Sequence, residues 1–157
     1  MPLIINPASL PEYAKTLLAE FRTVTELPVQ WGDQDAFGHV NNVMYFRWFE
    51  SARIDLLSVC PSGVTMSGKG LGPILASISC NYRRQLRFPD TILIGSRISR
   101  VGRSSADISH IVISQTDQAI VADGSSVIVV FDYDAQRVTR IPDDLRIQFE
   151  SCMTAAK

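Results

Sequence analysis

The sequence of 157 residues lacks several features that would assign it to a specialised class. No segment contains the roughly 18 uninterrupted apolar residues that a membrane helix needs, and the N-terminus lacks the basic region and apolar run of a secretory signal. The formal net charge is −1, from 15 basic and 16 acidic residues, so no broad positive surface for nucleic acid is expected. These absences predict a cytoplasmic protein that binds neither a membrane nor nucleic acid.

Cysteine and histidine are scarce. The three cysteines, Cys60, Cys80 and Cys152, form no C-x-x-C pair and are odd in number, so neither a zinc site nor a disulfide framework is indicated. We expect all three to be free thiols in a reducing compartment. The two histidines, His39 and His110, offer no convincing metal site. The sequence therefore predicts no metal and no cofactor.

Familiar catalytic and binding motifs are also missing. There is no G-x-S-x-G segment, which disfavours a serine hydrolase of the α/β-hydrolase type. The glycines of residues 68–72 lack the spacing of a dinucleotide-binding loop. Asp33 and Asp35 have the spacing of the first two ligands in a calcium loop, but Phe37 and Met44 occupy positions that need oxygen ligands. The aspartates therefore need another explanation.

Hydrophobic and turn patterns predict one domain that contains a long helix and a run of strands. We expect helices at 12–21 and 42–59, a loop at 61–72, and strands at 23–31, 74–82, 91–101, 105–114, 119–133 and 137–141. Strands that are not interleaved with helices predict an α+β fold in which the sheet covers the long helix. Residues 1–22 are interpreted as an N-terminal extension with a short helix, and residues 23–157 as the main domain.

The helix expected at 42–59 is apolar around most of its circumference. Only Arg47, Glu50 and Arg53 form a narrow polar side, so we expect this helix to be buried. Among the strands, 105–114 carries Ala106, Ile108, His110 and Val112 in one phase. This alternation predicts one buried face, on which His110 is interpreted as a core or interface histidine.

An acidic pair and a histidine stand just before the long helix. Unpaired N–H groups at a helix N-terminus attract negative charge and can stabilise the oxyanion that forms when a carbonyl is attacked. A carboxylate beside them can attack the carbonyl or activate a water molecule. The segment therefore favours acyl transfer, although Asp33 and Asp35 could also be loop residues that only form turns.

The pattern Asp-x-Asp-x-x-Gly-His-Val-Asn-Asn-x-x-Tyr of residues 33–45 resembles the 4-hydroxybenzoyl-CoA thioesterase-like hotdog family. The resemblance extends through Tyr82, Asp90 and residues 102–105. It implies a hotdog fold, in which a mostly antiparallel sheet wraps a long central helix. It also implies hydrolysis of an acyl-CoA thioester to a free carboxylic acid and coenzyme A, in a homodimer or homotetramer.

The same resemblance implies roles for individual residues. Asp35 corresponds to the catalytic carboxylate, acting as nucleophile or general base, and the backbone N–H of Asn42 to the group that polarises the carbonyl. His39 is interpreted as an auxiliary or structural residue. Gly38 is expected at the substrate. Tyr45, one turn into the apolar helix, is interpreted first as a core residue and second as part of the lining of the acyl pocket. The coenzyme A phosphates are expected to meet basic and hydroxyl groups supplied by a second subunit, namely Arg103, Ser104 and Ser105.

Other functions remain open at this stage. His-Val-Asn-Asn also resembles plant-type acyl-carrier-protein thioesterases, but those carry an asparagine where this chain has Phe37. A hydratase-like hotdog enzyme and a non-catalytic acyl-CoA-binding protein are further alternatives. The basic group Arg83, Arg84 and Arg87 is either a solvated strand end or a positive rim for the coenzyme A nucleotide.

Overall fold

The computed structural model describes residues 3–60 and 66–155. Its helices are α1 (Glu12–Leu18), α2 (Asn42–Val59) and α3 (Asp143–Ser151), with short 3-10 turns η1 (Pro7–Ser9) and η2 (Trp31–Asp33). Its strands are β1 (Leu3–Ile4), β2 (Thr23–Pro28), β3 (Leu71–Tyr82), β4 (Thr91–Val101), β5 (Ser105–Ser114), β6 (Ala119–Asp132) and β7 (Arg137–Val138).

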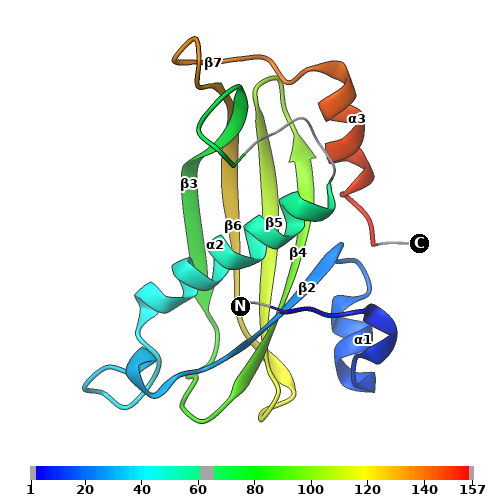
Figure 1. Ribbon diagram of the computed structural model, residues 1–157. Helices are drawn as coiled ribbons and strands as arrows, with labels where there is room; N and C mark the ends of the chain where they lie inside the picture. Colours follow the sequence, from blue (N-terminus) through cyan, green and yellow to red (C-terminus); the bar gives the residue numbers. More distant parts are fainter. Residues whose placement is uncertain (1–2, 61–65, 156–157) are drawn as a thin grey trace.

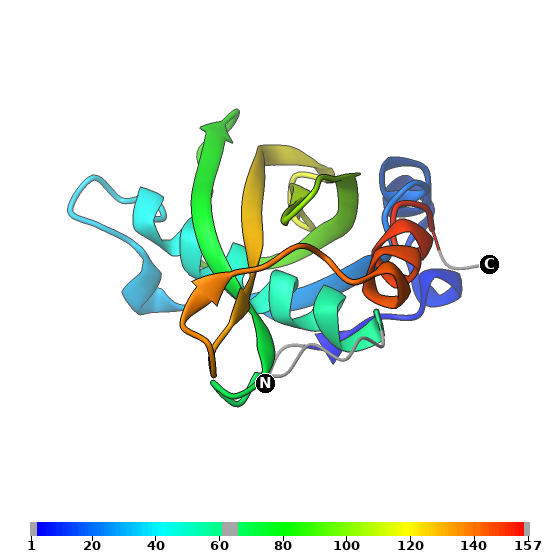
Figure 2. The ribbon, with the colours of Figure 1, turned by 90° about the horizontal axis from the view of Figure 1, so that it is seen from above.

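The strands form one antiparallel sheet in the order β1-β2-β4-β5-β6-β3, with β7 paired to β6. Helix α2 crosses one face of the sheet, which curls around it (Figures 1 and 2). Helices α1 and α3 lie on the side of the molecule away from β3, at opposite ends (Figure 1). The predicted α+β arrangement of a long helix against a mostly antiparallel sheet is confirmed.

Alternation along the strands places α1 and α2 on opposite faces of the sheet. Ile92 and Ile94 of β4 pack in the core cluster that contains the middle of α2. Leu93, between them, packs instead with Ala14 and Leu18 of α1. Successive strand side chains point to opposite faces, so β4 packs against both helices.

Helix α2 starts at a cap supplied by the sequence and buries one face. The Asn41 side chain accepts a hydrogen bond from the Val43 N–H at 3.0 Å, which satisfies a free donor of the first turn. The expectation that α2 is buried on nearly all sides is only partly right, because Val43 and Ile54 are 55% and 48% exposed. The helix therefore has an outer face that carries some apolar residues.

Arg53 is a second correction to the expected helix. The helix pattern places it on the polar side, but it is only 9% exposed and donates to the Ser126 hydroxyl at 3.2 Å. Ser126 is also hydrogen-bonded to His110, whose other ring nitrogen pairs with Ser96 at 2.8 Å. A buried polar group needs such partners, and His110 is the satisfied core histidine that the strand pattern predicted.

Several helices and strands begin or end at residues other than those predicted. The first helix ends at Leu18 and the following strand at Pro28, while β3 begins at Leu71 within the expected loop. Of that loop, residues 61–65 lie outside the described residues. Helix α3 is not among the predicted elements. This helix has Asp143 and Asp144 in its first turn, and acidic residues are favoured at that end.

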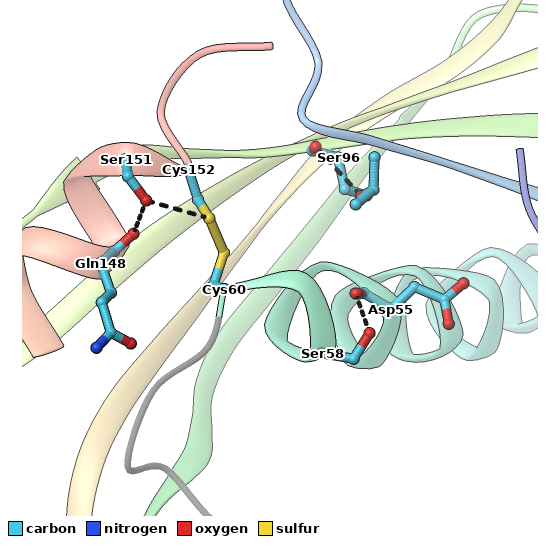
Figure 3. The surroundings of a disulfide bond; sticks show 8 residues. Asp55, Ser58, Cys60, Ser96, Gln148, Ser151 and Cys152 are labelled. Carbon is cyan, nitrogen blue, oxygen red and sulfur yellow. Dashed lines mark hydrogen bonds between the residues drawn. A yellow bond between two sulfur atoms is a disulfide. The ribbon is translucent and has the colours of Figure 1, made fainter. Parts of the chain in front are cut away.

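The expectation of three free thiols is wrong for two of them. Cys60 and Cys152 form a disulfide across 92 residues of sequence, with their Cα atoms 6.3 Å apart. The bond joins the C-terminal ends of α2 and α3 (Figure 3). Cys80 is a free thiol. The pairing escaped prediction because only the packing of α3 against α2 brings the two cysteines together.

Candidate active site

The loop between β2 and α2 is folded by its own polar groups. Asp33 is nearly buried, and its carboxylate accepts from the Gln30 N–H at 2.7 Å. Its main-chain oxygen accepts from the Asn41 N–H at 2.8 Å. Asp33 is therefore the structural member of the acidic pair, because it shapes η2 and anchors the residue that caps α2.

Asp35 is placed differently from Asp33. It is half-buried, and one carboxylate oxygen accepts from the Phe37 N–H at 2.9 Å. Its main-chain oxygen accepts from the Gly38 N–H at 3.1 Å, in a turn where Gly38 has a φ of 79°. Within residues 3–60 and 66–155, no donor bonds the second carboxylate oxygen of Asp35. That oxygen is therefore available to a substrate or a water molecule.

Among residues 3–60 and 66–155, one N–H group of the first turn of α2 has no hydrogen-bond acceptor. The Asn41 N–H binds the Asp33 oxygen, the Val43 N–H binds the Asn41 side chain, and the Met44 N–H binds the Asn41 main-chain oxygen. For the Asn42 N–H, the described part of the chain provides no acceptor. The Asn42 N–H is therefore a free donor at the positive end of the helix.

A surface pocket of about 380 Å³ brings these groups together. Four predicted site residues line it: Asp35, His39, Asn42 and Tyr45. Gly38 is not among the lining residues and lies in the exposed turn beside it. Residues of the acidic loop and of the first turn of α2 therefore line one cavity.

The wall of the pocket includes residues that the sequence analysis did not assign to catalysis. Tyr82, Arg83 and Arg84, at and just beyond the end of β3, also line it. The rings of Tyr45 and Tyr82 meet edge to face, with centroids 5.1 Å apart. Tyr82 lies 40 residues from Asn42 in sequence, so no local pattern could have shown that the two share a pocket.

Neither Tyr45 nor the nearby Cys80 offers an anionic nucleophile. Burial raises the pKa of Tyr45 above its ordinary value, so its hydroxyl remains protonated. Burial also raises the pKa of the Cys80 thiol to about 11, and a thiol is a strong nucleophile only as the thiolate. Asp35 is the acidic residue among those that line the pocket.

The two arginines on the pocket rim differ in their pairing. Arg83 forms an ion pair with Asp123 at 2.5 Å, and this guanidinium lowers the pKa of the Asp123 carboxyl. Arg84 is exposed and has no acidic partner in the described part of the chain. Arg84 is therefore the cation on the rim that remains available to an anionic ligand.

The remaining predicted binding residues lie at another part of the fold. Arg103, Ser104 and Ser105 are in the β4–β5 connection and the start of β5. The main-chain oxygens of Arg103 and Ser104 accept from Ile141 and Val130, near α3 and β6. The structure of one chain does not bring them to the Asp35 pocket, so their assignment to a second subunit stays a prediction.

The described residues contain neither a metal-binding cluster nor a membrane-spanning helix. In residues 3–60 and 66–155, no group of three or more histidine, cysteine, aspartate or glutamate side chains could hold a metal ion. Over the same residues, no helix has the length and hydropathy needed to span a membrane.

Comparison with known proteins gives a consistent result. The model of a family described as the thioesterase-like superfamily matches residues 29–149. The long-chain acyl-CoA thioesterase FadM of Escherichia coli is 27% identical over 126 residues, which cover 80% of this chain and 96% of that protein.

Solved structures also resemble the fold. A structure of the thioesterase superfamily from Jannaschia sp. CCS1 has a TM-score of 0.83 at 24% identity, covering 96% of this chain and 94% of its own. A gentisyl-coenzyme A thioesterase has a TM-score of 0.69 at 26% identity, covering 80% of this chain and 98% of its own. The hotdog arrangement expected from the sequence is confirmed.

Proposed function

This chain belongs to the thioesterase-like superfamily, and on that premise we propose that it hydrolyses an acyl-CoA thioester to a carboxylic acid and coenzyme A. One observation carries the proposal. Asp35 and Asn42 line the same pocket, and within the described residues the Asn42 N–H has no acceptor. The names of the E. coli and gentisyl relatives, both coenzyme A thioesterases, support this substrate class.

In the proposed reaction, the thioester carbonyl oxygen accepts a hydrogen bond from the Asn42 N–H. Negative charge that develops on this oxygen is stabilised by the donor and by the positive end of α2. Asp35 then acts by one of two routes. As a nucleophile, its oxygen bonds the carbonyl carbon, the coenzyme A thiolate leaves, and water cleaves the resulting anhydride. As a base, it takes a proton from the water molecule that attacks the carbonyl carbon, and the C–S bond then breaks to release the carboxylic acid and the coenzyme A thiolate.

The coenzyme A moiety is proposed to bind at a subunit interface. Strand β3 pairs only with β6 in the described sheet, so its other edge is open to a second copy. Edge strands that pair in this way form symmetric dimers. In such a homodimer, or a homotetramer built from it, we expect Arg103, Ser104 and Ser105 of the other subunit to contact the phosphates. Light scattering that reports a monomer at micromolar concentration would contradict this arrangement.

Substitution of Asp35 tests the proposed chemistry. Release of coenzyme A is followed with a thiol-reactive dye, using acyl-CoAs with short, long and aryl acyl groups. Asp35→Asn is expected to lower kcat about 10³-fold, the effect of losing a general base or nucleophile, while circular dichroism remains that of the wild type. Asp33→Asn is the matched control, because Asp33 is structural, and we expect it to retain most activity.

Assays of hydrolysis and binding also separate the alternative functions. Near-normal hydrolysis by Asp35→Asn would refute the role of Asp35. Faster hydrolysis of acyl groups carried by an acyl carrier protein than of acyl-CoAs would favour that carrier. Saturable binding of acyl-CoA without any thiol release would favour a non-catalytic binding protein. The cytoplasmic location stays a prediction.

A further inference from the structure

The first turn of α2 is tied to the end of strand β3 by one side chain. The Tyr82 hydroxyl donates to the main-chain oxygen of Asn42 at 3.1 Å, although the residue is 47% exposed. We propose that Tyr82 is a positioning residue, which holds the Asn42 N–H in the direction that the thioester carbonyl requires. This inference rests on the proposed function, because it assigns the Asn42 N–H to the reacting carbonyl.

The peptide unit that joins Asn42 and Val43 is held at both of its polar ends. Its carbonyl oxygen accepts from Tyr82, and its N–H donates to the Asn41 side chain at 3.0 Å. A peptide unit is planar, so two such bonds fix its orientation. The N–H of Asn41, one residue earlier, is anchored to the Asp33 oxygen at 2.8 Å. The free Asn42 N–H therefore lies between two anchored points.

The tyrosine that makes this bond is itself well supported. Its backbone is paired with Ala122 of β6, and its ring meets Tyr45 edge to face. The Tyr45 ring in turn contacts Trp48, with centroids 5.1 Å apart. Burial raises the pKa of Tyr82, so the hydroxyl remains a donor at neutral pH. Tyr82 is therefore held by β6 through its backbone and by Tyr45 of α2 through its ring.

Loss of the Tyr82–Asn42 hydrogen bond should weaken stabilisation of the transition state more than it weakens substrate binding. An N–H donor stabilises the oxyanion only if it points at the place where charge develops, and the cost of misalignment grows as the charge grows. Without the Tyr82 hydroxyl, the peptide unit after Asn42 keeps only one of its two side-chain partners. The expected result is a lower kcat with little change in KM.

The test is Tyr82→Phe, which keeps the ring and removes the hydroxyl. Tyr133→Phe is a matched control, since the Tyr133 hydroxyl donates to the Pro73 main-chain oxygen at the same 3.1 Å but does not line the pocket. We expect Tyr82→Phe to lower kcat about five- to tenfold, the effect of roughly one hydrogen bond, with KM within about twofold of wild type. Tyr133→Phe should leave both constants unchanged.

Other results would overturn the proposal. A Tyr82→Phe kcat within twofold of wild type would show that the hydroxyl is not needed. A rise in KM alone would make Tyr82 a substrate contact instead of a positioning residue. An equal loss of kcat in Tyr133→Phe would indicate a general effect of removing tyrosine hydroxyls.

A second measurement does not depend on activity. Hydrogen exchange of the Val43 amide, followed by NMR, should be several-fold faster in Tyr82→Phe and unchanged in Tyr133→Phe, because this N–H is hydrogen-bonded to the Asn41 side chain and a lost anchor promotes local opening. If the wild type hydrolyses none of the acyl-CoAs, the proposed function fails, and this measurement still decides whether Tyr82 holds the turn. Unchanged exchange in Tyr82→Phe would reject the inference by itself.

Discussion

The imidazole of His110 lies flat against the ring of Phe49, with centroids 4.6 Å apart and an interplanar angle of 12°. This contact seats the middle of α2 on strand β5. Both nitrogens of the imidazole are hydrogen-bonded to serine hydroxyls, from Ser96 of β4 and Ser126 of β6. His110 therefore joins the helix to three neighbouring strands, and it does so as a neutral ring.

The neutral state of His110 predicts how stability depends on pH. Burial, assisted by the charge of Arg53, lowers the pKa of His110 to about 3, whereas an unfolded histidine titrates near 6.5. Between these values the unfolded chain binds a proton that the native chain does not. The free energy of unfolding should therefore fall as the pH drops from about 6.5 towards 3, by at most about 1.4 kcal/mol per pH unit from this group.

Urea denaturation at pH 7.5, 6.5, 5.5 and 4.5 measures this slope. We expect this contribution to the free energy of unfolding to be nearly constant above pH 6.5. Below pH 6.5, the fall in the free energy of unfolding should be smaller in His110→Gln than in the wild type. His39→Gln, which removes the half-buried histidine of the loop, provides the comparison. An identical slope in His110→Gln would show that another group is responsible.

Reduction of the disulfide is expected to destabilise the fold. Cys60 and Cys152 close a loop of 92 residues, and cross-links that close long loops typically stabilise by about 2–4 kcal/mol. Dithiothreitol should therefore lower the melting temperature of the wild type and have no effect on Cys152→Ser, which starts from the lower value. Cys80→Ser should still respond to the reductant. A wild type that is insensitive to reduction would contradict this expectation.

The difference between the two rim arginines predicts different effects on binding. Arg84→Gln should raise KM for an acyl-CoA about five- to tenfold, because an available cation attracts the anionic nucleotide, and the effect should shrink at high salt. Arg83→Gln should change KM by less than twofold, since Asp123 already neutralises that charge. Equal effects of the two substitutions would indicate that the ion pair opens when substrate binds.

Gly124 should not tolerate a side chain. A Cβ atom at this position would lie 2.6 Å from the Phe49 ring and would also clash with the Ser79 main-chain oxygen. Gly124→Ala is therefore expected to lower the free energy of unfolding by about 1–3 kcal/mol, the typical cost of overpacking. At Gly32 a Cβ atom would meet nothing within 4 Å, so Gly32→Ala, measured by the same denaturation, should change stability much less.

The sequence predicted those parts of the protein in which the deciding interactions are local. The cap of α2 depends on Asn41 and a donor two residues away. The buried phase of β5 follows from alternation along one strand, and it placed His110 in the core. The motif of residues 33–45 likewise predicted that a carboxylate and a helix N-terminus would lie together, and Asp35 and Asn42 do line one pocket.

Tertiary structure decided the contacts between residues far apart in sequence. The same helix pattern that marked Arg53 as polar could not show that Ser126, 73 residues away, would accept its hydrogen bond inside the core. Cys60 and Cys152 pair across 92 residues, and Tyr82 reaches Asn42 across 40. Periodicity and capping report interactions within one or two turns of the chain, whereas these contacts exist only because α2, α3 and β3 pack in one particular arrangement.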